Sequence, residues 1–180
     1  MANEFQRRKL RNVFAAFDTD GDGCLRKNDF EALAERWGRL PAVQRDAALG
    51  VRVEALMLGW WDHLLAVADS NHDGKVDTEE FLTLVDRLPA LREVVTATAD
   101  TVFDAVDENG DGRISRTEHS RLVDIWHGRT VPTDDVFDLL DLDGDGYLSR
   151  PEFALLWEQF WISADPSDPG NAMCGRIPEQ

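Results

Sequence analysis

Residues 141–152 read Asp-Leu-Asp-Gly-Asp-Gly-Tyr-Leu-Ser-Arg-Pro-Glu. Asp141, Asp143 and Asp145 place carboxylates at alternate positions, where their oxygens can face one cation. Glycine at position six permits a sharp turn that a Cβ would strain. Glu152 at position twelve is long enough to offer both of its oxygens. An all-oxygen ligand set of this kind suits Ca²⁺, which takes about six to eight oxygen ligands.

The same pattern occurs three more times. Residues 107–118 and 69–80 match it in full, whereas residues 18–29 carry Asp29 in place of glutamate at position twelve. The pattern D-x-[DN]-x-[DN]-G-x5-E is that of the EF-hand calcium loop. An acidic surface turn that binds nothing is the alternative, and the repetition argues against it, least strongly for the first loop. With position seven supplying a backbone carbonyl, the candidate metal ligands are Asp18, Asp20, Asp22, Cys24 and Asp29; Asp69, Asn71, Asp73, Lys75, Asp77 and Glu80; Asp107, Asn109, Asp111, Arg113 and Glu118; Asp141, Asp143, Asp145, Tyr147 and Glu152.

Position eight of every loop is apolar, with Leu25, Val76, Ile114 and Leu148 in chain order. Apolar residues at this position can pair two loops through a short β-bridge and cap a core beneath the ions. Apolar residues at helical spacing flank each loop. We therefore predict an all-α fold of four EF-hand helix–loop–helix units in two packed pairs, with short β-bridges between paired loops.

The spacing of the loops gives the predicted domain boundaries. Residues 1–88 form the N-terminal pair, residues 90–162 the C-terminal pair and residues 163–180 a tail, with Leu88-Pro89 as a break between the pairs. The tail is rich in Pro, Gly and Ser. Its composition leaves open whether it docks on the body or is disordered.

Some stretches depart from the regular repeat. Residues 41–68 predict one unusually long helix, with Gly50 and Gly59 as points of a kink or of close packing. Thr133 is the expected N-cap of a short helix before the fourth loop. The residue after position twelve is phenylalanine in three units but His119 in the third. We expect His119 to be a partly exposed replacement for phenylalanine rather than a residue that switches the protein with pH.

The charge of the chain sets limits on its partners. The formal net charge is −16, which argues against nucleic acid and anionic membranes as partners. Many of the acidic residues are loop ligands, so four bound Ca²⁺ would offset half of this charge and relieve the repulsion present in the metal-free form.

Residues 7–11 form a short basic patch that we interpret as a solvated helix face. Two cysteines are no disulfide framework. The first residues lack an apolar signal core, so we expect a cytoplasmic monomer.

Four such loops, a long spacing between the first two and 180 residues resemble the sarcoplasmic calcium-binding proteins. An arginine-rich composition makes calerythrin and its bacterial relatives the nearest resemblance. The resemblance covers about residues 4–162. It implies a compact all-α body with the two halves packed together, and a role in calcium buffering or transport. Some family members contain loops that have lost their metal ligands. All four loops of this chain keep their ligands, so we expect none of them to have lost metal binding.

We compare three functions that a protein with this predicted fold could have: enzyme, calcium sensor and calcium buffer. The four histidines are scattered, and no nucleophile signature or phosphate-binding loop is present, so we expect no enzyme. A calcium sensor would expose a methionine-rich groove to a target, but the chain has three methionines and six tryptophans. Large aromatic side chains suit a filled core between the halves, and so favour a buffer. A sensor that exposes an aromatic surface to a target protein is the alternative.

We expect the first loop to differ from the others in its metal preference. Asp29 is one methylene shorter than glutamate, so Mg²⁺ is expected to compete with Ca²⁺ best at this loop.

Overall fold

Four helix–loop–helix units follow one another along the chain, which confirms the predicted all-α fold. The structure, a computed structural model, describes residues 3–178; residues 1–2 and 179–180, at the outer ends of the predicted first pair and tail, lie outside the described part. The elements are α1 (Glu4–Phe17), β1 (Cys24–Leu25), α2 (Lys27–Trp37), α3 (Pro41–Arg45), α4 (Ala47–Ala68), β2 (Val76–Asp77), α5 (Thr78–Leu82), the 3-10 helix η1 (Thr83–Leu91), α6 (Arg92–Val106), β3 (Arg113–Ser115), α7 (Arg116–His127), α8 (Phe137–Leu140), β4 (Tyr147–Ser149), α9 (Arg150–Ile162) and the 3-10 helix η2 (Pro169–Ala172).

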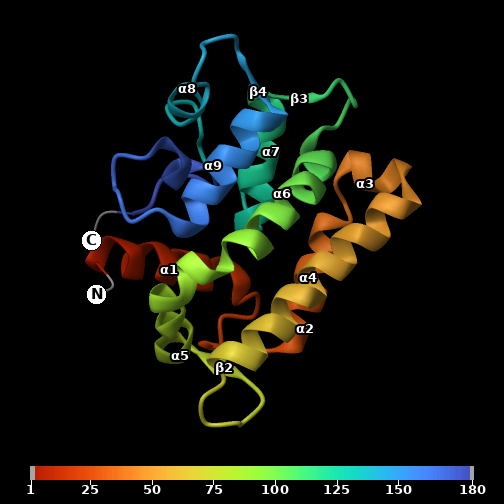
Figure 1. Ribbon diagram of the computed structural model, residues 1–180. Helices are drawn as coiled ribbons and strands as arrows, with labels where there is room; N and C mark the ends of the chain where they lie inside the picture. The colour runs from red at the N-terminus through yellow and green to blue at the C-terminus, as the bar shows by residue number, and fades with distance from the viewer. Residues whose placement is uncertain (1–2, 179–180) are drawn as a thin grey trace.

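The loops pair two by two through the predicted β-bridges. β1 runs antiparallel to β2 with Leu25 opposite Val76, and β3 runs antiparallel to β4 with Ile114 opposite Leu148. All four of these side chains are fully buried, at 0% exposure. In Figure 1, β2 lies at the bottom of the molecule and β3 and β4 lie at the top. The two loop pairs therefore occupy opposite ends, with the helices between them.

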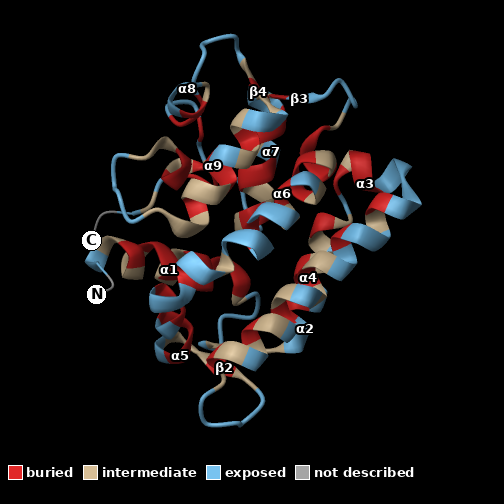
Figure 2. Ribbon diagram, in the orientation of Figure 1, coloured by how far each residue is buried: buried red, intermediate tan, exposed pale blue. Residues whose placement is uncertain are grey.

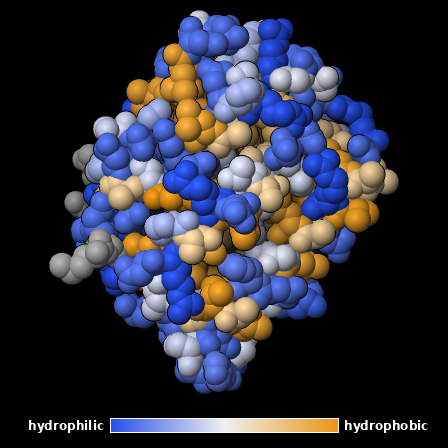
Figure 3. Space-filling model, in the orientation of Figure 1, coloured by the Kyte–Doolittle hydropathy of each residue, from blue (hydrophilic) through white to orange (hydrophobic). Residues whose placement is uncertain are grey.

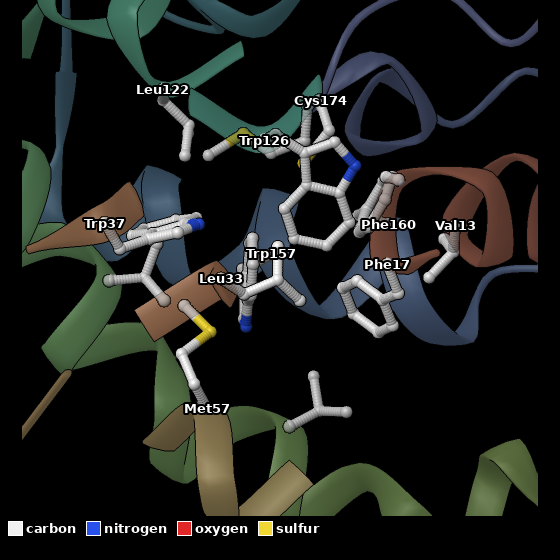
Figure 4. Packing of buried hydrophobic residues seen from close by; sticks show 14 of the residues in the cluster. Val13, Phe17, Leu33, Trp37, Met57, Leu122, Trp126, Trp157, Phe160 and Cys174 are labelled. Atoms are coloured by element: carbon white, nitrogen blue, oxygen red, sulfur yellow. The ribbon is translucent and has the colours of Figure 1, made fainter. Parts of the chain in front are cut away.

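An aromatic core joins the two halves. Phe17 of α1 lies 5.4 Å from Trp126 of α7, measured between ring centroids, and Trp60 of α4 stacks on Trp157 of α9 at 6.4 Å. Trp161 contacts both Phe17 and Trp60. Figure 4 shows Phe17, Trp126, Trp157 and Phe160 facing one another in this core. Each such pair adds about 0.5–1.5 kcal/mol beyond its buried area. The predicted role of the tryptophans in filling the space between the halves is confirmed.

The C-terminal tail docks on the C-terminal pair. η2 packs against α9 and α8, and the side chains of Met173 and Cys174 are buried at 0% and 1% exposure. Two histidines of α7 hold the tail through their Nε2 atoms: His119 contacts the Met173 carbonyl at 2.9 Å and His127 the Cys174 carbonyl at 2.7 Å. Of the two possibilities left open for the tail, docking is the one that the structure shows.

Two local predictions about polar side chains are wrong. His119 is fully buried rather than partly exposed, because the docked tail covers it and accepts its hydrogen bond. Lys9 lies in the basic patch but is 1% exposed. Its ammonium donates to the Gln159 and Ser163 carbonyls and to Oδ1 of Asn171. Burial lowers the pKa of Lys9 to about 8, against the opposing effect of Asp168. The patch is therefore partly an anchor for the tail.

Three predicted helix boundaries also differ from the structure. The long helix over residues 41–68 is interrupted at Asp46, whose extended backbone (φ −127°) ends α3 and whose side chain caps α4 by accepting from the N–H groups of Ala48 and Leu49. The second exiting helix changes to the 3-10 helix η1 at Thr83, before the break expected at Leu88-Pro89, and η1 runs through Pro89 directly into α6. The helix before the fourth loop begins at Phe137, and Thr133 instead offers its carbonyl to a preceding turn.

Exposed residues lie in the loops and on the outward faces of the helices. Figure 2 shows the loop ends of the molecule exposed, while the inner faces of α1, α7 and α9 are buried. Among residues 3–178, no helix has the length and apolarity that crossing a bilayer requires.

Candidate metal centres

All four loops share one backbone arrangement built around the carboxylate at position one. In the fourth loop, Asp141 Oδ1 accepts from the N–H of Asp145 at 3.2 Å, and Oδ2 accepts from Gly146 at 2.9 Å. Asp145 in turn accepts from the N–H of Tyr147 at 2.8 Å. The same bonds recur at equivalent positions of the other three loops. The loops are thus preorganised by their own carboxylates, which leaves further lone pairs free for a cation.

Two turns with positive φ give each loop its curvature. Position six is glycine throughout, with φ of +88° at Gly146. Position four is glycine in three loops, but in the second loop it is His72, with φ of +59°. His72 is the one non-glycine residue with positive φ among residues 3–178. A side chain in this region is strained, so the second loop keeps its shape at a cost that the other three avoid.

The first and fourth loops bring three carboxylates together. One oxygen from each of Asp141, Asp143 and Asp145 lies within 4.8 Å of the other two, and the aspartates at positions one, three and five of the first loop do the same. Oxygens that share one Ca²⁺ at about 2.3–2.6 Å lie within roughly 5 Å of one another. The spacing therefore fits a calcium ion.

Charge crowding in the fourth loop also fits a cation. The hydrogen bond from the Asp145 N–H favours the ionised form of Asp143. Burial and the carboxylates of Asp145, Glu152 and Asp141 outweigh it and raise the pKa of Asp143 above its ordinary value. A bound divalent cation would reverse this repulsion.

In the second and third loops an asparagine replaces the aspartate at position three. Oδ1 of Asn71 accepts from the Asp73 N–H at 2.9 Å, and Oδ1 of Asn109 accepts from Asp111 at 3.0 Å. Each amide oxygen thus points into its loop like the carboxylates it replaces. The amide oxygen is also a ligand that Ca²⁺ accepts.

The glutamates at position twelve serve as helix caps as well as candidate ligands. Oε2 of Glu80, Glu118 and Glu152 accepts from the N–H of the residue at position nine of its loop. Oε1 of Glu80 and Glu118 accepts from the N–H at position two. Oε1 of Glu152 is buried and has no hydrogen-bond partner among the described residues. A buried carboxylate oxygen without a donor needs a cation or a water, which supports this glutamate as a ligand.

The first loop is closed by the shorter Asp29, which has the same kind of partners at positions two and nine as Glu80 and Glu118. Asp29 is fully buried, and its Oδ1 accepts from the N–H and the hydroxyl of Thr19 at 3.1 and 2.9 Å. Its Oδ2 accepts from the Arg26 N–H at 2.8 Å. The guanidinium of Arg26, at position nine, forms an ion pair with Asp22. The hydrogen bond from the Cys24 N–H, followed by Arg26, lowers the pKa of Asp22.

Arg26 belongs to the candidate site through its ion pair with Asp22, but the loop pattern alone does not identify it, since the pattern leaves position nine free. Its signal in the sequence is a basic side chain inside an otherwise acidic loop. At the equivalent place the second loop has Asp77, whose carboxylate caps α5 by accepting from the Glu80 N–H at 2.9 Å. The first loop therefore carries a cation of its own beside a candidate ligand.

The residues at position seven lie at the start of the β-bridges. Cys24, Arg113 and Tyr147 begin β1, β3 and β4, and Lys75 directly precedes β2. Only their backbone carbonyls are candidate ligands, and their side chains are exposed or partly exposed. The Arg113 guanidinium sits 3.8 Å from the centroid of the Tyr147 ring. Cys24 and Cys174 are both free thiols.

Comparison with known proteins places these loops in a family. The EF-hand domain pair model matches residues 7–86, 60–123 and 99–158. A sarcoplasmic calcium-binding protein of Penaeus is 33% identical over 113 residues, which cover 57% of this chain and 57% of that protein. The matched region spans between 57% and 65% of the length of the first three sarcoplasmic relatives. The predicted resemblance to sarcoplasmic calcium-binding proteins is confirmed.

Solved structures share the whole fold. The sarcoplasmic calcium-binding protein of amphioxus superposes with a TM-score of 0.76 at 22% identity and covers 99% of this chain and 100% of its own. A calcium-binding protein of Streptomyces coelicolor superposes with a TM-score of 0.70 at 24% identity and covers 88% of this chain and 99% of its own. At this level of identity the likeness is one of fold.

Proposed function

Because the chain belongs to the EF-hand family and is a calcium-binding protein of that type, we propose that it binds four Ca²⁺, one in each loop. In the fourth loop, Asp141, Asp143 and Asp145 would each give a carboxylate oxygen, Tyr147 its carbonyl and Glu152 both oxygens. The equivalent residues would serve in the other loops. The carboxylate spacing and the unpartnered Glu152 oxygen support this assignment.

Mg²⁺ is the expected competitor at the first loop. Asp29 is one methylene shorter than the glutamates at position twelve of the other three loops, so it reaches less far toward an ion. Such a site would offer the ion fewer ligands, a number that suits the six-coordinate Mg²⁺ better than Ca²⁺. The first site would therefore discriminate least between the two ions.

We further propose that the protein is a monomeric cytoplasmic calcium buffer or transporter without enzymatic activity. One observation carries this proposal: the two halves share a single aromatic core, in which Phe17 and Trp60 pack against Trp126 and Trp157. The docked tail also covers the C-terminal pair. An ion bound to such a body would compact and stabilise it rather than open a groove.

A calcium sensor is the second candidate. The Streptomyces coelicolor relative is a calcium-binding protein of prokaryotic calcium-mediated regulation. Leu139, Leu142 and Leu155 of the C-terminal half are between 47% and 48% exposed, and could contribute to a surface for a target protein. On this proposal, Ca²⁺ would enlarge the apolar surface instead of reducing it.

Calorimetric titration with Ca²⁺, together with hydrodynamic size and binding of an apolar dye, tests both proposals. The buffer proposal expects four ions per chain, a smaller radius with Ca²⁺ and no increase in dye binding. Two or fewer ions at saturation would refute the four-site assignment. A calcium-dependent increase in dye binding, with affinity for amphipathic helices, would replace the buffer by the sensor.

A further inference from the structure

An apolar pocket lies between the two halves, apart from the ligand side chains of the loops. Its walls come from α1, α2, α4, α5, η1, α6 and α9, and its lining is apolar except for His63 and Thr98. The cavity volume is about 80 Å³ and the pocket opens to solvent. It has room for several waters at roughly 10–15 Å³ each, and because an apolar cavity of roughly 150 Å³ holds benzene, a ring would occupy the pocket together with its opening. Figure 3 shows hydrophobic side chains reaching the surface over this lower part of the molecule.

Two side chains of the pocket carry polar atoms with nothing to bond. Nε2 of His63 and Nε1 of Trp161 are buried and have no hydrogen-bond partner among the described residues. Thr98, by contrast, is satisfied, since its hydroxyl donates to the Val95 carbonyl and accepts from Trp157 Nε1. A buried N–H without a partner costs free energy, and an indole nitrogen can only donate. The Trp161 N–H therefore lacks an acceptor among the described residues.

We propose that this pocket binds a small, mostly apolar ring compound that carries a hydrogen-bond acceptor. The acceptor takes the Trp161 N–H, His63 supplies a second polar contact, and the ring packs among the aromatic and aliphatic walls. Concave apolar pockets with a few polar groups are where proteins hold such molecules. The pocket is bounded by seven elements, so it is too confined for a partner helix, whose diameter is about 10 Å.

The walls also connect the pocket to the first two loops. Phe17 directly precedes the first loop, and Phe30 and Phe81 directly follow position twelve of the first and second loops. A change in these loops would therefore reach the pocket walls. For this reason the pocket is best tested on the full chain saturated with Ca²⁺.

Phenol and toluene are suitable probes, because they have the same number of non-hydrogen atoms and only phenol offers an oxygen. The readout is the set of tryptophan indole N–H signals in NMR titrations. Both compounds should shift the Trp60 and Trp161 signals saturably, with dissociation constants of roughly 0.1–1 mM. Phenol alone should move the Trp161 N–H signal downfield, as a new hydrogen bond does.

Three variants locate the binding. Val94→Phe narrows the pocket at a residue that is 43% exposed and should weaken both probes roughly 10-fold, whereas the matched control Val51→Phe, at a 68% exposed residue of α4 outside the pocket lining, should leave both unchanged. Trp161→Phe removes the N–H but keeps a ring, and should weaken phenol by roughly 3- to 10-fold more than toluene. The proposal is overturned if neither probe shifts Trp60 and Trp161 saturably, or if Val94→Phe and Val51→Phe behave alike. An equal effect of Trp161→Phe on both probes would remove the acceptor from the proposal.

Discussion

The first and fourth loops begin alike and close differently. Their first six residues differ only at position two, and in both loops three aspartate oxygens lie within 4.8 Å of one another. In the fourth loop Glu152 keeps a buried oxygen without a partner, and neighbouring carboxylates raise the pKa of Asp143. In the first loop Asp29 is fully hydrogen-bonded and Arg26 pairs with Asp22. Two loops with nearly identical first halves therefore differ in their charge balance. In the fourth loop the ligand carboxylates form no ion pair among residues 3–178, whereas in the first loop Arg26 partly neutralises them.

The largest effect is expected where the need for a cation is greatest. Glu152→Gln removes the charge and one strong ligand oxygen of the fourth loop while keeping its shape, so Ca²⁺ affinity at this site should fall roughly 100-fold. The comparison variant Asp29→Asn should cost the first site roughly 10-fold or less, because its carboxylate is already engaged by Thr19 and Arg26. Calorimetric titrations resolve the two sites. Equal losses would show that the two loops close in the same way.

Both halves hold the tail, Lys9 through Asn171 and His119 through the Met173 carbonyl, and the His119 contact is a latch that depends on pH. Burial lowers the pKa of His119 to about 4, and the neutral ring holds the Met173 carbonyl. Because the unfolded chain binds this proton more tightly than the folded chain, the stability due to His119 is present above about pH 6.5 and is lost as pH falls toward 4.

We expect His119 to account for a loss of about 1–2 kcal/mol in unfolding free energy between pH 7.5 and pH 5. Denaturant unfolding at saturating Ca²⁺ measures this loss. His119→Phe, which installs the residue found at this place in the other three units, should reduce it. If the variant loses as much stability on acidification as the unmodified protein, the latch is not the cause.

A smaller effect is expected when the first loop is made to resemble the fourth. Arg26→Ser removes the internal cation beside Asp22 and should raise Ca²⁺ affinity at the first site by roughly 3- to 10-fold. Asp29→Glu should shift the preference of this site from Mg²⁺ toward Ca²⁺. Titrations with Ca²⁺ in the presence and absence of Mg²⁺ check both changes. Lys27→Ser, a change of equal charge at an exposed neighbour paired with Glu31, is the control. An equal gain in this control would assign the effect to net charge alone.

The smallest expected effect lies in the second loop, which has a strained position that the first and fourth loops lack. His72→Gly should stabilise the folded protein by about 0.5–1 kcal/mol, since φ of +59° suits glycine and strains a side chain. His72→Ala should not stabilise it, because alanine shares the strain. Thermal unfolding of the two variants in parallel distinguishes relief of strain from simple loss of the imidazole.

Much of the fold follows from local spacing in the sequence. The positions of the four loops, the apolar residues that pair them and the helices on either side all depend on residues a few positions apart. Leu25 and Val76 face each other across the β-bridge because both occupy position eight of paired loops. A candidate ligand set is equally local, since one loop of twelve residues supplies its carboxylates. Local residue patterns are therefore enough to predict the fold class and the candidate metal centres.

The burial of particular polar residues and the docking of the tail could not be predicted from such local patterns. Lys9 and His119 look exposed in the sequence, but the docked tail covers them and accepts their hydrogen bonds. The pairing of Arg26 with Asp22 needs the folded loop. The long predicted helix is interrupted at Asp46 because the Asp46 side chain caps α4. The apolar spacing on either side of Asp46 is that of a continuous helix, so it gives no sign of this interruption. Burial and long-range hydrogen bonds depend on segments distant in the chain, and no local pattern states which segments will meet.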